Sequence, residues 1–264
     1  MMRKIGINVS PDIIYGVDPF MDCLKHTGFD AVFTCGNEPD FISHVAAKCA
    51  SLGLTYEALH APWDNINDLW YADEKGAAVV EMLCESALLA SEHGIPKIIV
   101  HVSSREDCPH VTDAGLLNFD KFVNYAANKN VIVAIENQRK LGNIATLLEI
   151  YPKDSNVGFC WDNGHEACFA RGREYLPLFG DRCVYTHIHD NSCLYNVDEH
   201  LLPYDGQIDF RRVADLIHAS GYTGSLTLET DTPHEGSDKY ANLNLEQFVS
   251  KAYAAINRLR INAE

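Results

Sequence analysis

The chain has 264 residues and carries 21 basic against 37 acidic side chains, a formal net charge of −16. Hydrophobic residues make up 47% of it and charged residues 22%, which is typical of a globular protein. Because so acidic a surface repels phosphate backbones and anionic lipid, we expect no nucleic-acid partner and no membrane contact. No apolar run reaches the roughly 18 residues of a membrane span. The start, MMRKIGINVS, turns polar too early for a signal peptide, so we expect a cytoplasmic protein.

Short β-rich runs recur along the chain, each followed by a polar or glycine-containing turn. They predict eight strands, at residues 4–9, 30–35, 55–60, 97–102, 131–136, 157–162, 183–189 and 225–230. Apolar residues at helical spacing between these runs predict helices at residues 19–27, 39–52, 74–93, 116–129, 143–151, 171–179, 210–220 and 245–259. No linker-like stretch divides the chain, so we expect one domain over residues 1–264.

Eight β–α units in this length fit an α/β fold of the (β/α)8 barrel type, which typically has about 250 residues. A doubly wound open sheet is the main competitor. That fold is favoured by a glycine-rich phosphate loop after the first strand, but NVSPDIIYG contains no G-x-G-x-x-G pattern. The sequence therefore predicts the barrel.

Ionisable side chains stand at or just after the ends of six predicted strands, where a barrel has its active site. They are His60, His101, Glu136, Asp162, His165, His187, His189 and Glu229. Because side chains alternate along a strand, the residues two positions earlier should share their face and fill the barrel below them. Those residues are mostly small or apolar: Ala58, Ile99, Ala134, Cys160, Tyr185 and Thr227. The pattern predicts a polar mouth above an apolar interior.

Two glutamates, an aspartate and an imidazole at one mouth form a mixed oxygen and nitrogen ligand set. Such a set suits a divalent metal ion, namely Mn²⁺, Mg²⁺, Co²⁺ or Zn²⁺, and the absence of a cysteine ligand argues against a structural zinc site. A metal in that position can bind adjacent oxygens of a sugar and polarise a carbonyl.

Several motifs resemble those of the xylose isomerase-like TIM barrels. They are HAPW around His60, AIEN with Glu136, the D-x-x-H of Asp162 and His165, HIHDN from His187, the segment DEHLLPYDGQIDF and the final LTLET. The resemblance covers nearly the whole chain. It implies a TIM barrel that binds one divalent metal through Glu136, Asp162, His187 and Glu229.

The same resemblance implies a metal-dependent isomerase or epimerase of a small sugar or sugar phosphate. Its glutamates, Glu136 and Glu229, would act as the acid/base pair and transfer a proton through an enediolate. A dehydratase of a cyclic polyol is an alternative within the family. The chain differs from the ketose 3-epimerases at Cys193, where they carry an arginine, and has His189 where relatives often carry lysine. A particular sugar therefore does not follow from the resemblance.

The endonuclease IV branch of the same superfamily, zinc phosphodiesterases acting on abasic DNA, is a second alternative. That branch uses three metals, and His60, His101, His165, Asp198 and His200 match its additional ligands. We expect the last three to lie close enough to bind a second metal or the distal hydroxyls of a substrate. The loops WDNINDLWYADE, SREDCPH and TDTPHEGSD are acidic and aromatic, which favours the sugar enzyme over a DNA-binding one.

Substrate contacts are expected from His60, Trp63, His101, His165 and His189. The aromatic residues of the loop after the third strand, Trp63, Trp70 and Tyr71, either form a wall against a sugar ring or pack on the barrel rim. Two cationic residues that follow Glu136, Arg139 and Lys140, either meet a phosphate or carboxylate or are solvated surface charges. The sequence leaves a homo-oligomer open.

Overall fold

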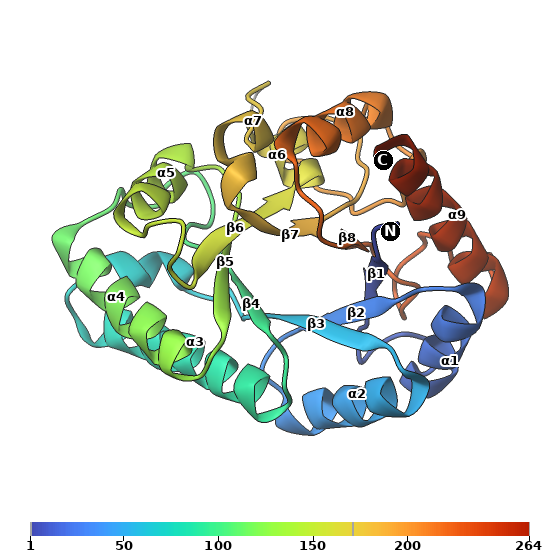
Figure 1. The fold of residues 1–264 in the computed structure, drawn as a ribbon, viewed down its shortest axis with the longest axis horizontal. Helices are drawn as coiled ribbons and strands as arrows, with labels where there is room; N and C mark the ends of the chain where they lie inside the picture. Colours follow the sequence, from blue (N-terminus) through green and yellow to red (C-terminus); the bar gives the residue numbers. More distant parts are fainter. Residues whose placement is uncertain (1, 171, 264) are drawn as a thin grey trace.

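A computed structural model describes residues 2–170 and 172–263. Its eight parallel strands are β1 (Ile5–Asn8), β2 (Ala31–Cys35), β3 (Thr55–His60), β4 (Lys97–Val100), β5 (Ile132–Glu136), β6 (Val157–Asp162), β7 (Cys183–His187) and β8 (Leu226–Leu228). They pair in the order β7-β6-β5-β4-β3-β2-β1-β8. Ile188 joins the two ends, donating its N–H to Thr227 at 2.8 Å and accepting the N–H of Glu229 at 3.1 Å. The fold is the predicted (β/α)8 barrel (Figure 1).

Helices surround the strands on the outside of the ring (Figure 1). They are α1 (Val17–Thr27), α2 (Pro39–Leu52), α3 (Glu74–Glu92), α4 (Asp113–Asn128), α5 (Leu141–Ile150), α6 (Asn163–Phe169), α7 (Leu176–Phe179), α8 (Phe210–Ser220) and α9 (Leu245–Ala263), with short 3-10 turns η1 (Ile66–Trp70) and η2 (Gly180–Arg182). None of the helices in the described ranges is both long and apolar enough to cross a bilayer.

All eight predicted strands are confirmed, but the helices around β6 differ from the prediction. The helix expected at 171–179 is only Leu176–Phe179, and residue 171 lies outside the described residues. Gly172, at φ +80°, forms a turn ahead of α7, and Pro177 stands in the first helical turn. Helix α6 was not predicted, because its start, Asp-Asn-Gly, has the composition of a turn.

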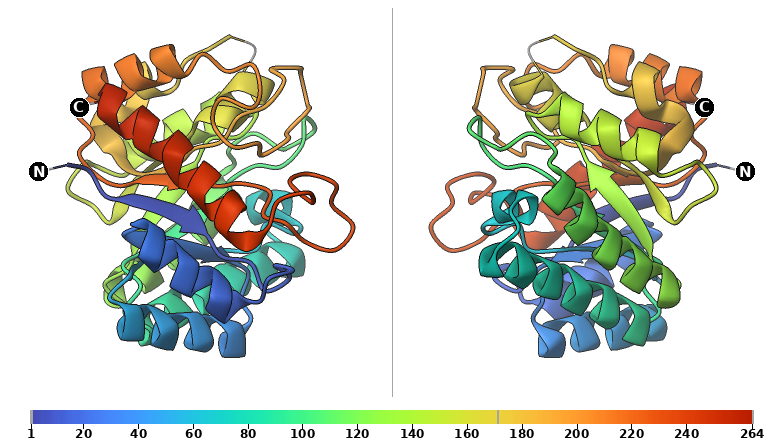
Figure 2. Two further views of the ribbon diagram at one scale, coloured as in Figure 1. Left: turned by 90° about the vertical axis from the view of Figure 1, so that its right-hand side faces the viewer. Right: turned by 90° about the vertical axis from the view of Figure 1, so that its left-hand side faces the viewer.

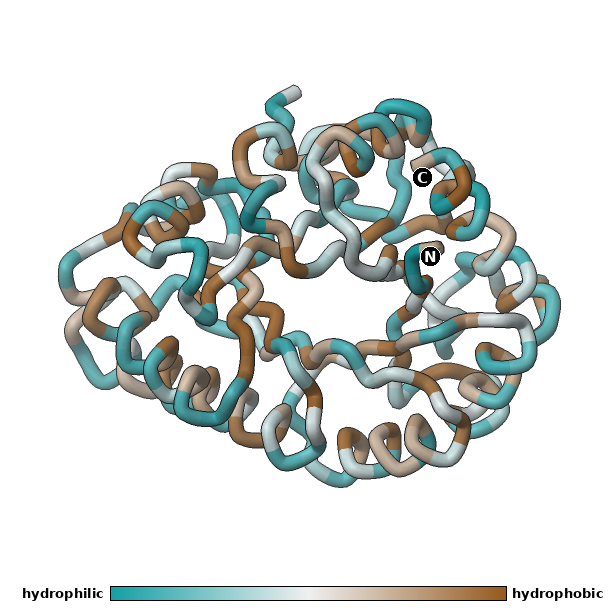
Figure 3. Tube along the Cα trace, in the orientation of Figure 1, coloured by the Kyte–Doolittle hydropathy of each residue, from teal (hydrophilic) through white to brown (hydrophobic). Residues whose placement is uncertain are grey.

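The predicted apolar interior is confirmed. Phe33, Ala58, Ile99, Ala134, Cys160 and Tyr185 form one buried cluster inside the ring. A second, larger cluster fills the space between the strands and the helices, and Figure 3 shows hydrophobic residues following the strands. With the interior closed by packing, a ligand can reach the barrel only at an end.

The loops that follow the strands lie at one end of the barrel. Figure 2 shows long loops extending on the side opposite the N-terminus, among them the orange segment around residue 200. Two of them, residues 101–112 and 188–209, connect β4 to α4 and β7 to α8. These loops surround the polar strand ends.

Candidate active site

Four predicted ligands converge at the loop end of the barrel. Glu136, Asp162 and His187 are the last residues of β5, β6 and β7, and Glu229 follows β8 directly. Each offers one ligand atom, and these atoms all lie within 4.8 Å of one another. The first three side chains are fully buried, whereas that of Glu229 is 13% exposed. We call these four residues the strand cluster.

Glu136 is surrounded by imidazoles. Its Oε1 lies 2.8 Å from Nδ1 of His187, and its Oε2 lies 3.0 Å from Nε2 of His60 and 2.7 Å from Nε2 of His101. His60, His101 and Glu136 form a second group whose ligand atoms lie close enough to hold a metal. Glu136 belongs to three such groups, because it also forms one with Cys160 and His187.

The charges in the strand cluster support one another. Burial alone would raise the pKa of Glu136, but His187 and His101 outweigh it and hold that pKa well below its usual range. His187 also outweighs burial at Glu229 and lowers its pKa. Burial would lower the pKa of His187, but Glu229 and Glu136 raise it to about 10. Both carboxylates therefore stay ionised at neutral pH, as the ligands of a cation must be.

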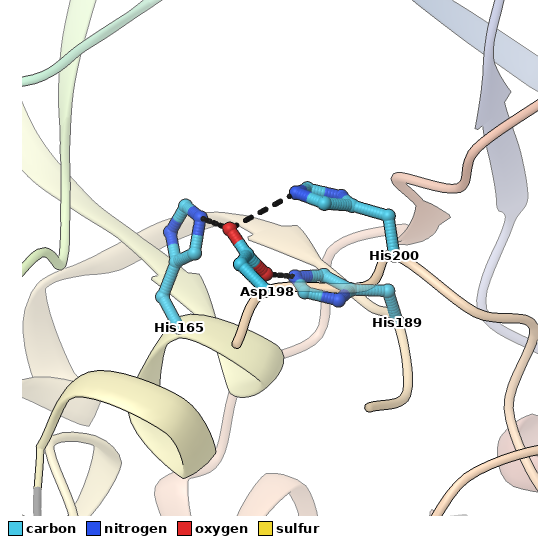
Figure 4. Close-up of side chains that lie close together, drawn as sticks. All are labelled: His165, His189, Asp198 and His200. Atoms are coloured by element: carbon cyan, nitrogen blue, oxygen red, sulfur yellow. Dashed lines mark hydrogen bonds and ion pairs between the residues drawn. The ribbon is translucent and has the colours of Figure 1, made fainter. Parts of the chain in front are cut away.

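A second set of four residues, the loop cluster, lies beside the first. It consists of His165, His189, Asp198 and His200, whose ligand atoms also lie within 4.8 Å of one another (Figure 4). Asp198 Oδ2 lies 3.1 Å from Nε2 of His165 and 3.2 Å from Nε2 of His200, and the rings of His189 and His200 stack at 4.0 Å. Burial would lower the pKa of His200, but its hydrogen bond with Asp198 raises it to about 9.

Helix α6 positions His165. Asp162 is its N-cap and accepts the backbone N–H of His165 at 2.6 Å, so the same residue starts the helix and belongs to the strand cluster. Gly164 lets the helix approach the segment after β7 closely, because a Cβ at that position would stand 2.0 Å from Cε1 of His189. The short D-N-G-H sequence therefore places ligands of both clusters.

Asp190, which follows the loop-cluster residue His189, holds the loop that carries Asp198 and His200. Fully buried, it accepts four backbone N–H groups at 2.8–3.0 Å, those of Asn191, Tyr204, Gly206 and Ile208. Such a carboxylate is a strong multiple acceptor and fixes the path of the chain. This positioning role of Asp190 was not predicted from the HIHDN motif.

A cavity of about 310 Å³ opens above the clusters. Its walls are His60, Trp63, His101, Ser104, Arg105, Gln138, Arg139, His165, Phe169, Asp198, His200 and Glu229. Trp63, 46% exposed, stands beside the rings of His60 and His101. Of the residues expected to contact a substrate, His189 is absent from these walls and is the fully buried member of the loop cluster.

The other aromatic and cationic loop residues singled out in the sequence differ in whether they line the cavity. Trp70 is buried and donates its indole N–H to Val102 at 2.9 Å, so it packs on the barrel rim. Tyr71 and Lys140 do not line the cavity, whereas Arg139 does. Other wall residues were not predicted from the sequence. Among them is Gln138, whose side-chain nitrogen lies 3.2 Å from Nε2 of His101 and 2.9 Å from Nδ1 of His165; its place two residues after Glu136 in AIENQ was the signal for it.

The donors fit divalent metal ions. His60 and His200 each direct Nδ1 at a backbone carbonyl, at 2.7 and 3.0 Å, while Nε2 faces a carboxylate. A neutral imidazole that donates Nδ1–H presents a lone pair at Nε2, which is how metal-ligating histidines are oriented. Among the described residues, the buried atoms Glu229 Oε2 and Asp198 Oδ1 face only imidazole nitrogens, His187 Nδ1 at 3.1 Å and His189 Nε2 at 3.9 Å. Both clusters could hold a metal.

Known proteins share this architecture. An uncharacterized protein of Sinorhizobium fredii is 31% identical over 207 residues, covering 73% of this chain and 64% of that protein. The chain thus spans less than two thirds of that relative's length. The crystal structure of IOLI protein with a binding zinc atom has a TM-score of 0.79 at 14% identity, covering 99% of both chains. An L-ribulose 3-epimerase has a TM-score of 0.75 at 19% identity, covering 99% of this chain and 96% of that one.

The two solved structures are too distant in sequence to show more than a common fold. The family follows from the sequence itself, because residues 21–248 match the model described as xylose isomerase-like TIM barrel. This match takes in every strand from β2 to β8 and therefore both clusters. The chain belongs to the xylose isomerase-like TIM barrel family.

Proposed function

We propose that the protein is a divalent-metal-dependent isomerase or epimerase of a small sugar. The observation that carries the proposal is the convergence of two glutamates, Glu136 and Glu229, with Asp162 and His187 beneath a cavity of about 310 Å³. That volume is at the lower end of small-molecule sites and suits a single sugar. The similarity in fold to an L-ribulose 3-epimerase supports the same class.

The strand cluster would hold the metal ion, which when bound would withdraw electron density from the oxygens of the substrate and acidify the neighbouring C–H group. Glu229 lines the cavity and is ionised, so we assign it removal of the proton from that carbon. Returning a proton to the same carbon from the other side gives an epimer, and returning it to the adjacent carbon interconverts aldose and ketose.

Glu136 is the second member of the acid/base pair in this proposal. It is fully buried, and His101 lies between it and the cavity, with 2.7 Å separating His101 Nε2 from Glu136 Oε2. Burial lowers the pKa of His101, so its ring is neutral at pH 7 and able to pass a proton on. His60, Trp63 and His165 complete the walls around the substrate.

The test is turnover of a ketose and aldose panel in D₂O with Mn²⁺, Co²⁺ or Mg²⁺, analysed by chromatography and mass spectrometry. We expect a new isomer that carries deuterium at the reacting carbon. Glu229→Gln should lower turnover at least about a hundredfold, while Glu149→Gln, on the exposed face of α5, should match wild type. Product without solvent deuterium, together with an active Glu229→Gln variant, would refute the proton-transfer mechanism.

Phosphodiester hydrolysis of abasic DNA by a three-metal site is the second candidate. It is favoured by one observation: the His60–His101–Glu136 group, the strand cluster and the loop cluster adjoin one another. The net charge of −16 opposes DNA binding. Metal analysis of protein purified without chelator, combined with nicking of an abasic duplex, separates the candidates. Three zinc ions with sub-micromolar binding and nicking would favour the nuclease.

A further inference from the structure

The walls of the cavity contain two arginines, Arg105 and Arg139, and no lysine. This is notable in a chain in which acidic residues outnumber basic ones by 37 to 21. Both arginines belong to loops at the barrel mouth: Arg105 follows β4 and Arg139 follows β5. Guanidinium groups suit planar, bidentate recognition of phosphate and carboxylate.

Arg139 is held in place. Its guanidinium carbon lies 3.5 Å from the centroid of the Phe169 ring, and its Nε donates to Asn196 Oδ1 at 2.8 Å. Phe169 in turn stacks on the ring of His165, 5.1 Å away. Within the described ranges no hydrogen bond or ion pair occupies the terminal amino groups of Arg139. A guanidinium fixed on one face and through Nε loses little entropy when its free edge binds a ligand.

Arg105 is exposed and makes no hydrogen bond or ion pair within the described residues. Its φ of +62° is rare for a side chain of this type. It also borders an acidic hollow formed with Asp64, Asp68 and Asp107, which partly offsets its charge. Of the two arginines, Arg139 should therefore contribute more to binding an anion.

We propose that Arg139, assisted by Arg105, binds an anionic group of the substrate, so that the substrate is a sugar phosphate or a sugar acid. The inference rests on the isomerase or epimerase function proposed above. The stack of Arg139 on Phe169 and of Phe169 on His165 separates the guanidinium from the strand cluster. The anion is therefore at the end of the sugar remote from the reacting carbonyl, where it holds that carbonyl over the strand cluster.

Fructose, fructose 6-phosphate and fructuronate test this, because they share one ketone and differ only at the remote carbon. Binding to the Mn²⁺-loaded protein is measured by calorimetry for wild type, Arg139→Gln, Arg105→Gln and the double variant. Arg211→Gln is the matched control, since Arg211 is exposed on α8 and away from the cavity. We expect one or both anions to bind at least about tenfold more tightly than fructose.

Arg139→Gln should remove most of this preference and Arg105→Gln a smaller part, whereas the Arg211→Gln control should keep the preference of the wild type. Preference for the phosphate alone identifies a phosphate ester, and equal preference for fructuronate identifies any remote anion. Equal affinity for all three ligands, or a preference that survives in the double variant, would overturn the inference. Turnover is read separately, so anion preference without deuterium exchange would instead contradict the proposed function.

Discussion

The strand cluster and the loop cluster lie side by side, yet they differ in composition and in what supports them. Three carboxylates and one imidazole make up the strand cluster, against one carboxylate and three imidazoles in the loop cluster. The first stands on strand ends fixed by the hydrogen bonds of the barrel. Asp198 and His200 of the second belong to an irregular loop, which Asp190 holds in place.

This difference suggests a division of labour. A set of ligands that is almost entirely buried and stands at the ends of paired strands is preorganised and suited to chemistry, which tolerates little displacement. A set that depends on a loop is more easily perturbed and open to the cavity, where it can meet the distal part of a substrate or a second metal. This division can be tested with substitutions that change one cluster at a time, by measuring the effect on both clusters.

The largest effect is expected at Glu136. Glu136→Gln removes the charge that faces His60, His101 and His187, and should lower turnover at least about a hundredfold. His200→Gln, in the loop cluster, should lower it by no more than about tenfold, the low end for groups that act on a metal site indirectly. Steady-state rates with the best substrate of the panel measure both. Equal losses of turnover in the two variants would contradict the proposed division of labour between the clusters.

Asp190→Ala should cause the next largest change, in stability. The substitution leaves four backbone N–H groups, one buried and three part-buried, without their acceptor, so we expect the free energy of unfolding to fall by about 3 kcal/mol. Asp215→Ala, at an exposed position of α8, is the control and should change it by less than about 0.5 kcal/mol. Urea denaturation measures both, and a loss below about 1 kcal/mol would mean that the loop is held by other contacts.

The two clusters should differ in metal selectivity, with the strand cluster binding Mn²⁺ about tenfold more tightly than the loop cluster does. Carboxylate oxygens suit Mn²⁺ and imidazole suits Zn²⁺, so Mn²⁺ should fill the strand cluster first and Zn²⁺ should fill both. His200→Ala should then lower the zinc content by one ion and leave Mn²⁺ affinity unchanged. Metal-free protein titrated by calorimetry, with metal analysis after dialysis, gives both numbers. Loss of Mn²⁺ binding in His200→Ala would show that the clusters are not separate.

The strand cluster was predictable because two regularities determine it. Side chains alternate along a strand, and parallel strands present their carboxyl ends at one face, so the positions of Glu136, Asp162 and His187 relative to the apolar layer follow from spacing alone. The structure confirms that layer. Glu229 lies one residue beyond β8, an offset small enough to leave the prediction intact.

The loop cluster was predictable only in part. The D-x-H pair of Asp198 and His200 is visible in the sequence, but its position depends on long-range hydrogen bonds to Asp190 that no local pattern reveals. Phe169 was overlooked because α6 has the composition of a turn, and Arg105 because nothing in its loop distinguishes it from a solvated charge. Contacts between segments far apart in the chain determine these positions.

The smallest predicted effect tests how closely the loop cluster depends on packing. Gly164→Ala places a methyl group where Cε1 of His189 would be 2.0 Å away, so either α6 or the imidazole must shift. The shift should lower zinc affinity at the loop cluster by a few-fold to about tenfold, as changes beside ligating residues do, with Mn²⁺ affinity at the strand cluster nearly unchanged.

Gly142→Ala is the matched control, because the added methyl group meets nothing within 4 Å and lies on α5. It should keep both affinities and raise stability by roughly 0.5–1 kcal/mol. Equal metal affinities in the two variants would show that His189 adjusts without cost, and that the backbone of the loop, rather than the close approach of α6, sets the geometry of the cluster.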